Sequence, residues 1–243
     1  MEDMYTSTDT PALFLALIGG ACVYTGMAFV VLGWSTCRGE SDVVCTRLRK
    51  NRHGVRSRTA TLVLLPATWL LATWQRASEL AAGSPPRHTR VACLPAVWVG
   101  RRLDTVLDLP PDVDVVLDLT SESTDGVDVC HNTDGLLYIC VPSLQGRLGN
   151  LPMLTHTLRV LARASAPLKP GALSVYVHCC SGDCRAAAVA ALLLHAQNRY
   201  SSWRAAYKHI RRQRPSVFLT PQVVRACDAT AALLKKPAAL PTL

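Results

Sequence analysis

The sequence predicts an α/β fold in which a central, mostly parallel sheet is flanked by helices and preceded by one or two N-terminal membrane helices. The sheet is predicted because short apolar runs bounded by Pro, Gly and Asp alternate with helical stretches beyond residue 90, and the last run leads straight into an Ala- and Leu-rich helix. The membrane helices are predicted by two uncharged apolar stretches before residue 80. At 243 residues the chain could hold one or two domains.

The first segment, residues 1–37, is predicted to be a transmembrane anchor. It has no charge from Pro11 to Thr36, and its apolar core, Ala12 to Trp34, would reach about 35 Å as a helix, which is enough to cross a bilayer with some tilt. A cleaved signal peptide would instead have a basic start and a shorter apolar core. The first 37 residues hold three acidic residues and no Lys or Arg, which favours the anchor.

The second segment, residues 38–58, is a basic loop. It carries seven Lys and Arg residues against two acidic ones, a net charge of +5 in a chain whose total is +9. Beside an apolar helix, such a block favours anionic lipid headgroups as its partner. A nucleic-acid partner would require interleaved aromatic residues or a recognisable binding motif, and the sequence has neither. We therefore expect a membrane partner and no nucleic acid.

The third segment, residues 59–80, is a second membrane or interfacial helix. Its apolar part, Thr59 to Trp74, would reach about 24 Å as a helix, less than the ~30 Å hydrocarbon layer, and Pro66 interrupts it. It is either a short second span or a helix at the interface with its tryptophans at headgroup level. The positive-inside rule places the basic loop inside, so an interfacial helix would leave the following domain inside and a second span would put it outside.

Residues 81–90 are rich in Gly, Pro and Ser and are predicted to be a linker, followed by an α/β domain over residues 91–236. We expect this domain to place helices on both faces of its sheet. The expected strands are Val91–Leu94, Val97–Val99, Val115–Leu119, Leu137–Val141 and Leu173–Val177. The expected helices are Leu151–Ala164, Ala186–Asn198, Ser202–Arg212 and Pro221–Leu234.

The stretch VHCCSGDCR, residues 177–185, lies between the last predicted strand and the helix after it. A loop in this position presents several backbone N–H groups to one point at the positive end of a helix dipole, which suits an anion the size of phosphate. Cys179 would be a nucleophile below a bound phosphoryl group, since both the helix N-terminus and a nearby arginine favour a thiolate. Arg185 would grip two phosphoryl oxygens and stabilise the transition state. Gly182 would give the loop the backbone freedom that a tight turn needs.

The order His, Cys, five residues, Arg, with Gly third among the five, resembles the signature of cysteine-dependent protein tyrosine phosphatases in the form used by the dual-specificity subfamily. The segments 210–217 and 219–222 resemble that subfamily's C-terminal helix-turn-helix, and 97–102 and 115–120 resemble the opening strands of its membrane-attached members. The resemblance implies a cysteinyl-phosphate intermediate. It implies that His178 holds the loop and the thiolate by hydrogen bonding, and that the phosphate is bound by the loop residues Cys180, Ser181, Gly182, Asp183 and Cys184.

Three positions depart from this family pattern. The family places an Asp that acts as general acid on a loop some thirty residues before the cysteine, where this sequence has Gln145, and an amide cannot protonate a leaving group as a carboxylic acid does. The residue after the arginine, usually Ser or Thr, is Ala186. Asp183 lies within the loop, where a carboxylate opposes anion binding unless it points outward.

Two functions follow. The first is an active phosphatase, on a phosphoprotein or a phospholipid. Superfamily members that act on phosphoinositides typically carry Lys or Arg within the loop, and none lies between Cys179 and Arg185, so the resemblance favours a phosphoprotein or a singly phosphorylated lipid. The second is a pseudophosphatase that keeps the loop to bind phosphate. A catalytic thiol needs a reducing compartment, which favours the cytoplasmic side of the membrane. The ten cysteines include no CxxC pair and no zinc-ligand spacing. We expect neither metal nor cofactor, since the loop itself would stabilise the charge.

Overall fold

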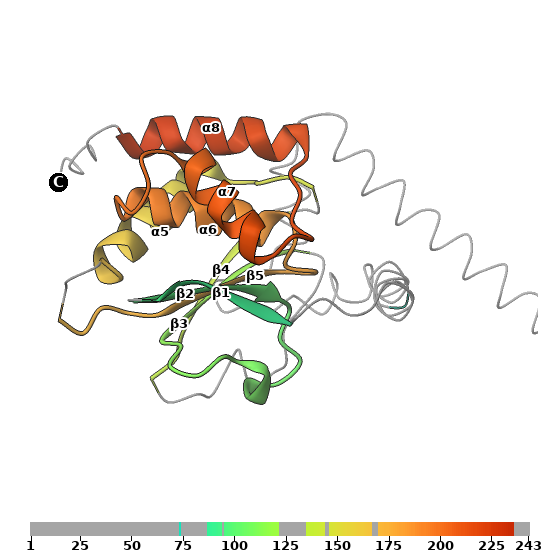
Figure 1. Cartoon of the computed structure of the whole chain (residues 1–243), viewed down its shortest axis with the longest axis vertical. Helices are drawn as coiled ribbons and strands as arrows, with labels where there is room; N and C mark the ends of the chain where they lie inside the picture. Colours follow the sequence, from blue (N-terminus) through green and yellow to red (C-terminus); the bar gives the residue numbers. More distant parts are fainter. Residues whose placement is uncertain are drawn as a thin grey trace, which may run out of the picture.

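The computed structural model describes residues 87–93, 95–121, 135–143, 146–166 and 170–235, together with Thr73. It has an α/β architecture in which a five-stranded sheet carries a layer of helices (Figure 1). The predicted anchor, the basic loop, most of the linker and all of the second apolar stretch except Thr73 lie outside the described residues. Within the described ranges, no helix combines the length and the apolar character needed to cross a bilayer.

The sheet has the order β1-β2-β5-β3-β4. The strands are β1 (His88–Cys93), β2 (Ala96–Arg101), β3 (Val115–Thr120), β4 (Leu137–Ser143) and β5 (Val175–Cys179). The pairs β2–β5, β5–β3 and β3–β4 are parallel, whereas β1 pairs antiparallel with β2. The sheet is therefore mixed, because the two residues between β1 and β2 can connect only antiparallel strands.

The four α-helices lie close to their predicted positions. They are α5 (Leu151–Ala164), α6 (Arg185–Ala196), α7 (Trp203–Gln213) and α8 (Pro221–Lys235). A short 3₁₀-helix, η1 (Val106–Asp108), was not predicted. Two of the α-helices begin at polar caps: the side chain of Asn150 accepts a hydrogen bond from the amide of Met153, and that of Ser202 accepts one from the amide of Ala205. Such caps satisfy amides that the first helical turn leaves without partners.

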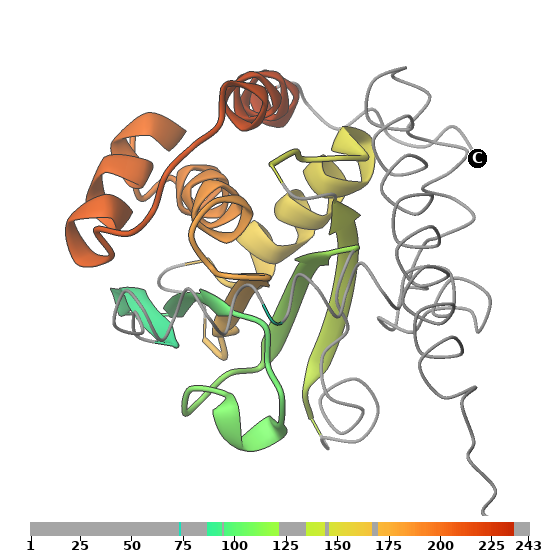
Figure 2. The ribbon, with the colours of Figure 1, turned by 90° about the vertical axis from the view of Figure 1, so that its right-hand side faces the viewer.

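Helix α6 lies at the centre of the helical layer. Every residue from Arg185 to Leu194 is buried, and the helix contacts β5 and β2 as well as α5, α7 and α8 (Figure 2). A helix that is apolar on all sides is expected in such a position. Its N-terminus and the end of β5 are therefore held by packing from several directions.

The prediction of α-helices on both faces of the sheet was wrong for the described residues. All four α-helices lie on one face (Figures 1 and 2), where Val175 and Val177 of β5 point into the main core. On the opposite face, Tyr176 packs with Leu103 and Val116 in a smaller cluster under the segment that contains η1. The large apolar core lies on the helical face, whereas the described part of the opposite face carries only the small cluster around Tyr176, which the η1 segment covers.

Candidate active site

The candidate site is the loop between β5 and α6. Cys179 is the last residue of β5, Arg185 is the first residue of α6, and both side chains are buried. The backbone amide of Gly182 donates a hydrogen bond to Sγ of Cys179, with an N–S distance of 3.3 Å. The loop therefore turns back over the sulfur at the N-terminal end of a helix, where negative charge is stabilised.

Gly182 is required by this turn for two reasons. Its φ is +81°, in the left-handed region that L-residues with a Cβ rarely adopt. A Cβ at this position would also lie 2.6 Å from the carbonyl carbon of Gly100, at the end of β2. The loop thus packs directly on the backbone of the neighbouring strand, and a contact between backbones cannot relax as a flexible side chain would.

The carboxylate of Asp183 is engaged by residues that follow α7. Its Oδ1 accepts hydrogen bonds from Nε of Arg214, at 3.1 Å, and from Oγ of Ser216, at 2.7 Å. The Arg214 guanidinium is buried, and it also donates to the carbonyl of Ser181 and to Oγ1 of Thr89 in β1. Arg214 thus offsets the negative charge of Asp183 and ties the loop to both the helical layer and the edge strand.

The side chain of Arg185 lies across the C-terminal ends of the parallel strands. Its Nη1 donates hydrogen bonds to the carbonyl oxygens of Leu119 in β3, at 3.1 Å, and of Ser143 at the end of β4. These contacts fix the orientation of a guanidinium that is only 2% exposed. The C-terminal edge of parallel strands is the usual place for ligands in α/β proteins, so Arg185 is placed where an anion over the loop could be bound.

His178 lies on the opposite side of β5 from Cys179, because side chains alternate along a strand. Its ring stacks on Tyr176, with centroids 5.7 Å apart, and its Nε2 lies 3.8 Å from Oδ1 of Asp118 in β3. Asp118 is fully buried and accepts hydrogen bonds from the amide and hydroxyl of Thr120, both at 2.7 Å, and from the hydroxyl of Tyr138. The role that the family resemblance implies for His178 stays a prediction; the structure places this side chain beside a carboxylate.

Cys180 and Ser181 help to hold the loop in place through hydrogen bonds that involve backbone groups. The carbonyl of Cys180 accepts a hydrogen bond from the amide of Arg102, and Oγ of Ser181 accepts one from the amide of Asp183. Cys184 is buried at the start of α6, and its burial raises the pKa of its thiol. Gln145, the residue at the predicted general-acid position, lies outside the described residues.

The structure adds two residues that the motif did not indicate, Asp118 and Arg214. Asp118 could have been noticed from the sequence, because a carboxylate interrupts the otherwise apolar strand Val115–Thr120. Arg214 gives no such signal: it is one of several arginines around residue 212, and its pairing with Asp183 spans 31 positions.

Neither a protein-family model nor a curated protein sequence matches the chain. Among solved structures it is similar to PTPMT1 in complex with PI(5)P (17% identity, TM-score 0.49, 61% of this chain and 96% of that chain) and to human DUSP28 (18%, 0.49, 63% and 97%). It is also similar to the human tyrosine phosphatase-like serine/threonine/tyrosine-interacting protein (12%, 0.47, 60% and 96%). At such identities the similarity concerns the path of the backbone and not the chemistry of the site.

Proposed function

We propose that the chain is a cysteine-dependent phosphatase of the protein tyrosine or dual-specificity type, anchored to a membrane with its catalytic domain on the cytoplasmic side. The observation that carries the proposal is the loop itself: the amide of Gly182 faces the sulfur of Cys179 at the N-terminus of α6, and Arg185 begins that helix. The proposal places the Cys179 thiolate, this amide and the Arg185 guanidinium around one phosphoryl group at the positive end of a helix dipole.

The reaction would run in two displacements. The Cys179 thiolate attacks phosphorus, a sulfur–phosphorus bond forms, and the ester oxygen leaves with the electron pair of the broken phosphorus–oxygen bond. Water then attacks phosphorus, the sulfur–phosphorus bond breaks, and inorganic phosphate and the thiolate are released. Arg185 would stabilise the charge on the phosphoryl oxygens in both steps. The pairing of Asp183 with Arg214 supports this role for the loop, because it offsets a charge that would otherwise repel the substrate.

The leaving group decides which substrates are expected. With Gln145 in place of a carboxylic acid, a phenolate, which departs without much protonation, should be released far better than the alkoxide of phosphoserine. The preferred substrate would then be a phosphotyrosine protein. The alternative, a singly phosphorylated phospholipid, has an alkyl leaving group and would need another source of protons.

The test is hydrolysis of 4-nitrophenyl phosphate by the full-length chain under reducing conditions. We expect turnover by the wild type, a fall to background in Cys179→Ser, and an unchanged rate in Cys93→Ser, whose exposed thiol lies outside the loop. In a second arm, Gln145→Asp should raise the rate on a phosphoserine peptide by about 10²-fold or more, which is typical of a general acid. Equal rates for the wild type and Cys179→Ser would rule out the catalytic proposal.

A pseudophosphatase is the second candidate, and Ala186 favours it. This residue follows Arg185, is fully buried, and has no hydroxyl that could assist breakdown of a phosphoenzyme. Such a protein would bind a phosphotyrosine peptide without releasing phosphate, and it would lose that binding in Arg185→Met. Turnover that depends on Cys179 would exclude it.

A further inference from the structure

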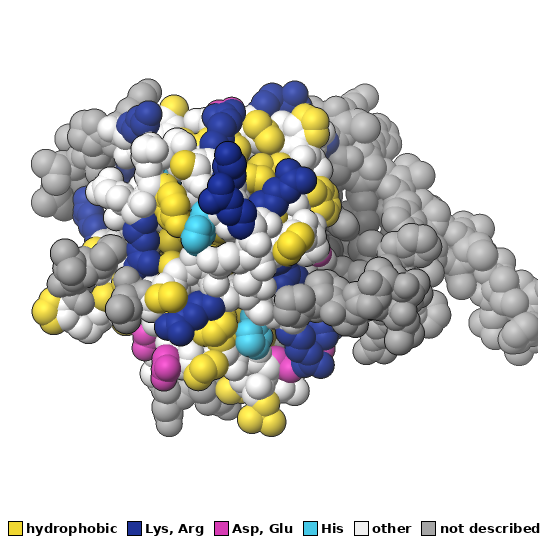
Figure 3. Space-filling model, viewed as in Figure 1, with side chains coloured by type: hydrophobic (Ala, Val, Ile, Leu, Met, Phe, Trp, Pro, Cys, Tyr) yellow, Lys and Arg dark blue, Asp and Glu magenta, His cyan; other side chains and the backbone are white. Residues whose placement is uncertain are grey.

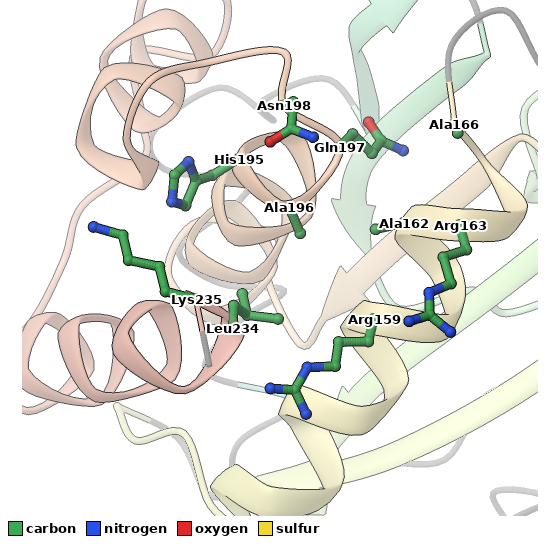
Figure 4. A pocket seen from close by; sticks show the side chains of 10 residues that line it. All are labelled: Arg159, Ala162, Arg163, Ala166, His195, Ala196, Gln197, Asn198, Leu234 and Lys235. Carbon is green, nitrogen blue, oxygen red and sulfur yellow. The ribbon is translucent and has the colours of Figure 1, made fainter. Parts of the chain in front are cut away.

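A second site lies at the other end of α6. A cavity of about 400 Å³ opens where α5, α6 and α8 end, and Figure 4 shows the side chains that line it. Helix α6 has 12 residues, so the cavity is about 18 Å from the loop at its N-terminus. A ligand bound there would not reach Cys179. The volume is within the range of small-molecule sites.

Basic side chains from α5 and α8, together with a histidine from α6, surround this cavity. Arg159 and Arg163 are one turn apart on α5 and project from the same side of it, and Lys235 extends from the last turn of α8 toward the side where His195 lies (Figure 4). The described residues that line the cavity include no Asp or Glu. The three helix C-termini contribute about half a negative charge each. The three Lys and Arg charges exceed that sum, so the cavity keeps a positive potential.

The polar groups of the cavity differ in the hydrogen bonds that they already form within the described part of the chain. Arg159 donates a hydrogen bond to the carbonyl of Leu233 and so supports the end of α8. Nδ1 of His195 donates to the carbonyl of Tyr200 at 3.0 Å, which leaves Nε2 as the other nitrogen able to meet a ligand. Arg163 and Lys235 are exposed at the rim and form no such internal contact within the described part of the chain.

Gln197 supports the wall of this cavity. It is only 7% exposed, and its Nε2 donates to the carbonyl and to Oγ of Ser165, at 2.9 and 2.6 Å, which ties the end of α6 to the end of α5. Its Oε1 has almost no accessible surface, so a ligand in the cavity would contact the basic side chains and not this amide oxygen.

We infer that this cavity binds a small phosphate ester. The phosphate would be held mainly by Arg163 and Lys235 at the rim, with Arg159 adding positive charge. A soluble polyol phosphate and the headgroup of a glycerol-based anionic lipid share this chemistry. Binding here is independent of the phosphatase proposal, since it uses none of the loop residues.

The test is calorimetric titration of the full-length chain in the Cys179→Ser background, which prevents turnover, with sn-glycerol 3-phosphate as the probe. Arg163→Gln/Lys235→Gln removes two charges from exposed positions of the cavity. Lysines and arginines also lie over α7 and α8 (Figure 3), and Lys208→Gln/Arg225→Gln removes the same charge from exposed positions outside the cavity. We expect glycerol 3-phosphate to bind the cavity about tenfold more weakly in the cavity variant and with unchanged affinity in the control.

Two further arms identify the ligand. Propyl phosphate, which lacks a free hydroxyl, should show the same loss of affinity in the cavity variant as glycerol 3-phosphate, because the phosphate is the group that is recognised; a loss with only one of the two would refute this. Phosphatidylcholine vesicles with and without phosphatidylglycerol test the lipid source. If the cavity variant binds vesicles more weakly than its control only when phosphatidylglycerol is present, the ligand is a lipid headgroup. If the two variants differ only with the soluble probe, the ligand is a metabolite. Identical binding of both probes by the cavity variant and its control would overturn the proposal.

Discussion

The two proposed anion sites at the ends of α6 are built differently. At its N-terminus the loop around Cys179 relies on backbone amides held in place by Gly182 and by the buried Arg214. At its C-terminus the proposed phosphate-ester site relies on exposed side chains, Arg163 and Lys235, that project from separate helices. A backbone site is specific in geometry and sensitive to any change of conformation, whereas a side-chain site depends mainly on total charge.

The largest effect should come from Gly182→Ala. The new Cβ would combine an unfavourable positive φ with a 2.6 Å approach to the backbone of Gly100, so we expect a loss of about 4 kcal/mol in the free energy of unfolding and no aryl phosphatase activity. The matched control is Gly171→Ala, where φ is also positive but no atom lies within 4 Å of the added Cβ, and about 1 kcal/mol is expected. Urea denaturation measures both; equal losses would show that the contact with β2 is unimportant.

A smaller effect is expected for Arg214→Gln. This change leaves the carboxylate of Asp183 without its guanidinium partner and breaks the ties to Ser181 and Thr89, at a cost of about 3 kcal/mol. Arg163→Gln, at the other end of α6, should change stability by less than about 0.5 kcal/mol because that side chain is exposed. If the two variants unfold at the same urea concentration, Arg214 does not hold the loop.

A still smaller loss of stability is expected at alkaline pH. Burial raises the pKa of Cys227 to about 12 and also raises that of Cys184, whereas an unfolded chain releases a thiol proton near pH ~8.5. The stabilisation from Cys227 is therefore complete below about pH 8.5 and is lost progressively as the pH rises toward 12, by about 2 kcal/mol at pH 10. Cys227→Ala should show a smaller decline between pH 7 and pH 10 in urea denaturation.

Local patterns in the sequence predicted the helices and the loop well. The bounds of α5 were predicted correctly, because an apolar stripe begins directly after Asn150 and has Pro152 in its first turn. The motif placed Cys179 and Arg185 at the two ends of a loop between a strand and a helix, and in the structure β5 runs two residues further, to Cys179, and α6 begins one residue earlier, at Arg185. Each of these features depends on neighbours within a few positions of the chain.

The features that were missed depend on residues far apart. The antiparallel edge strand, the single layer of helices and the Asp183–Arg214 pair all arise from packing between distant segments. The phosphate-ester cavity needs α5 and α8 to end side by side, and no pattern within either helix shows that Arg163 and Lys235 share a surface. The predicted membrane anchor and Gln145 lie outside the described residues, so they stay predictions.

The position of β5 has one more consequence. This strand lies between β2 and β3, paired in parallel with both, and it directs Cys179 toward the helices and His178 toward the other side. Loss or gain of a single residue within β5 would exchange these two directions and carry the thiol to the wrong side of the sheet. Homologous chains should therefore keep the length of this strand constant, even where its apolar residues are exchanged for others of similar size.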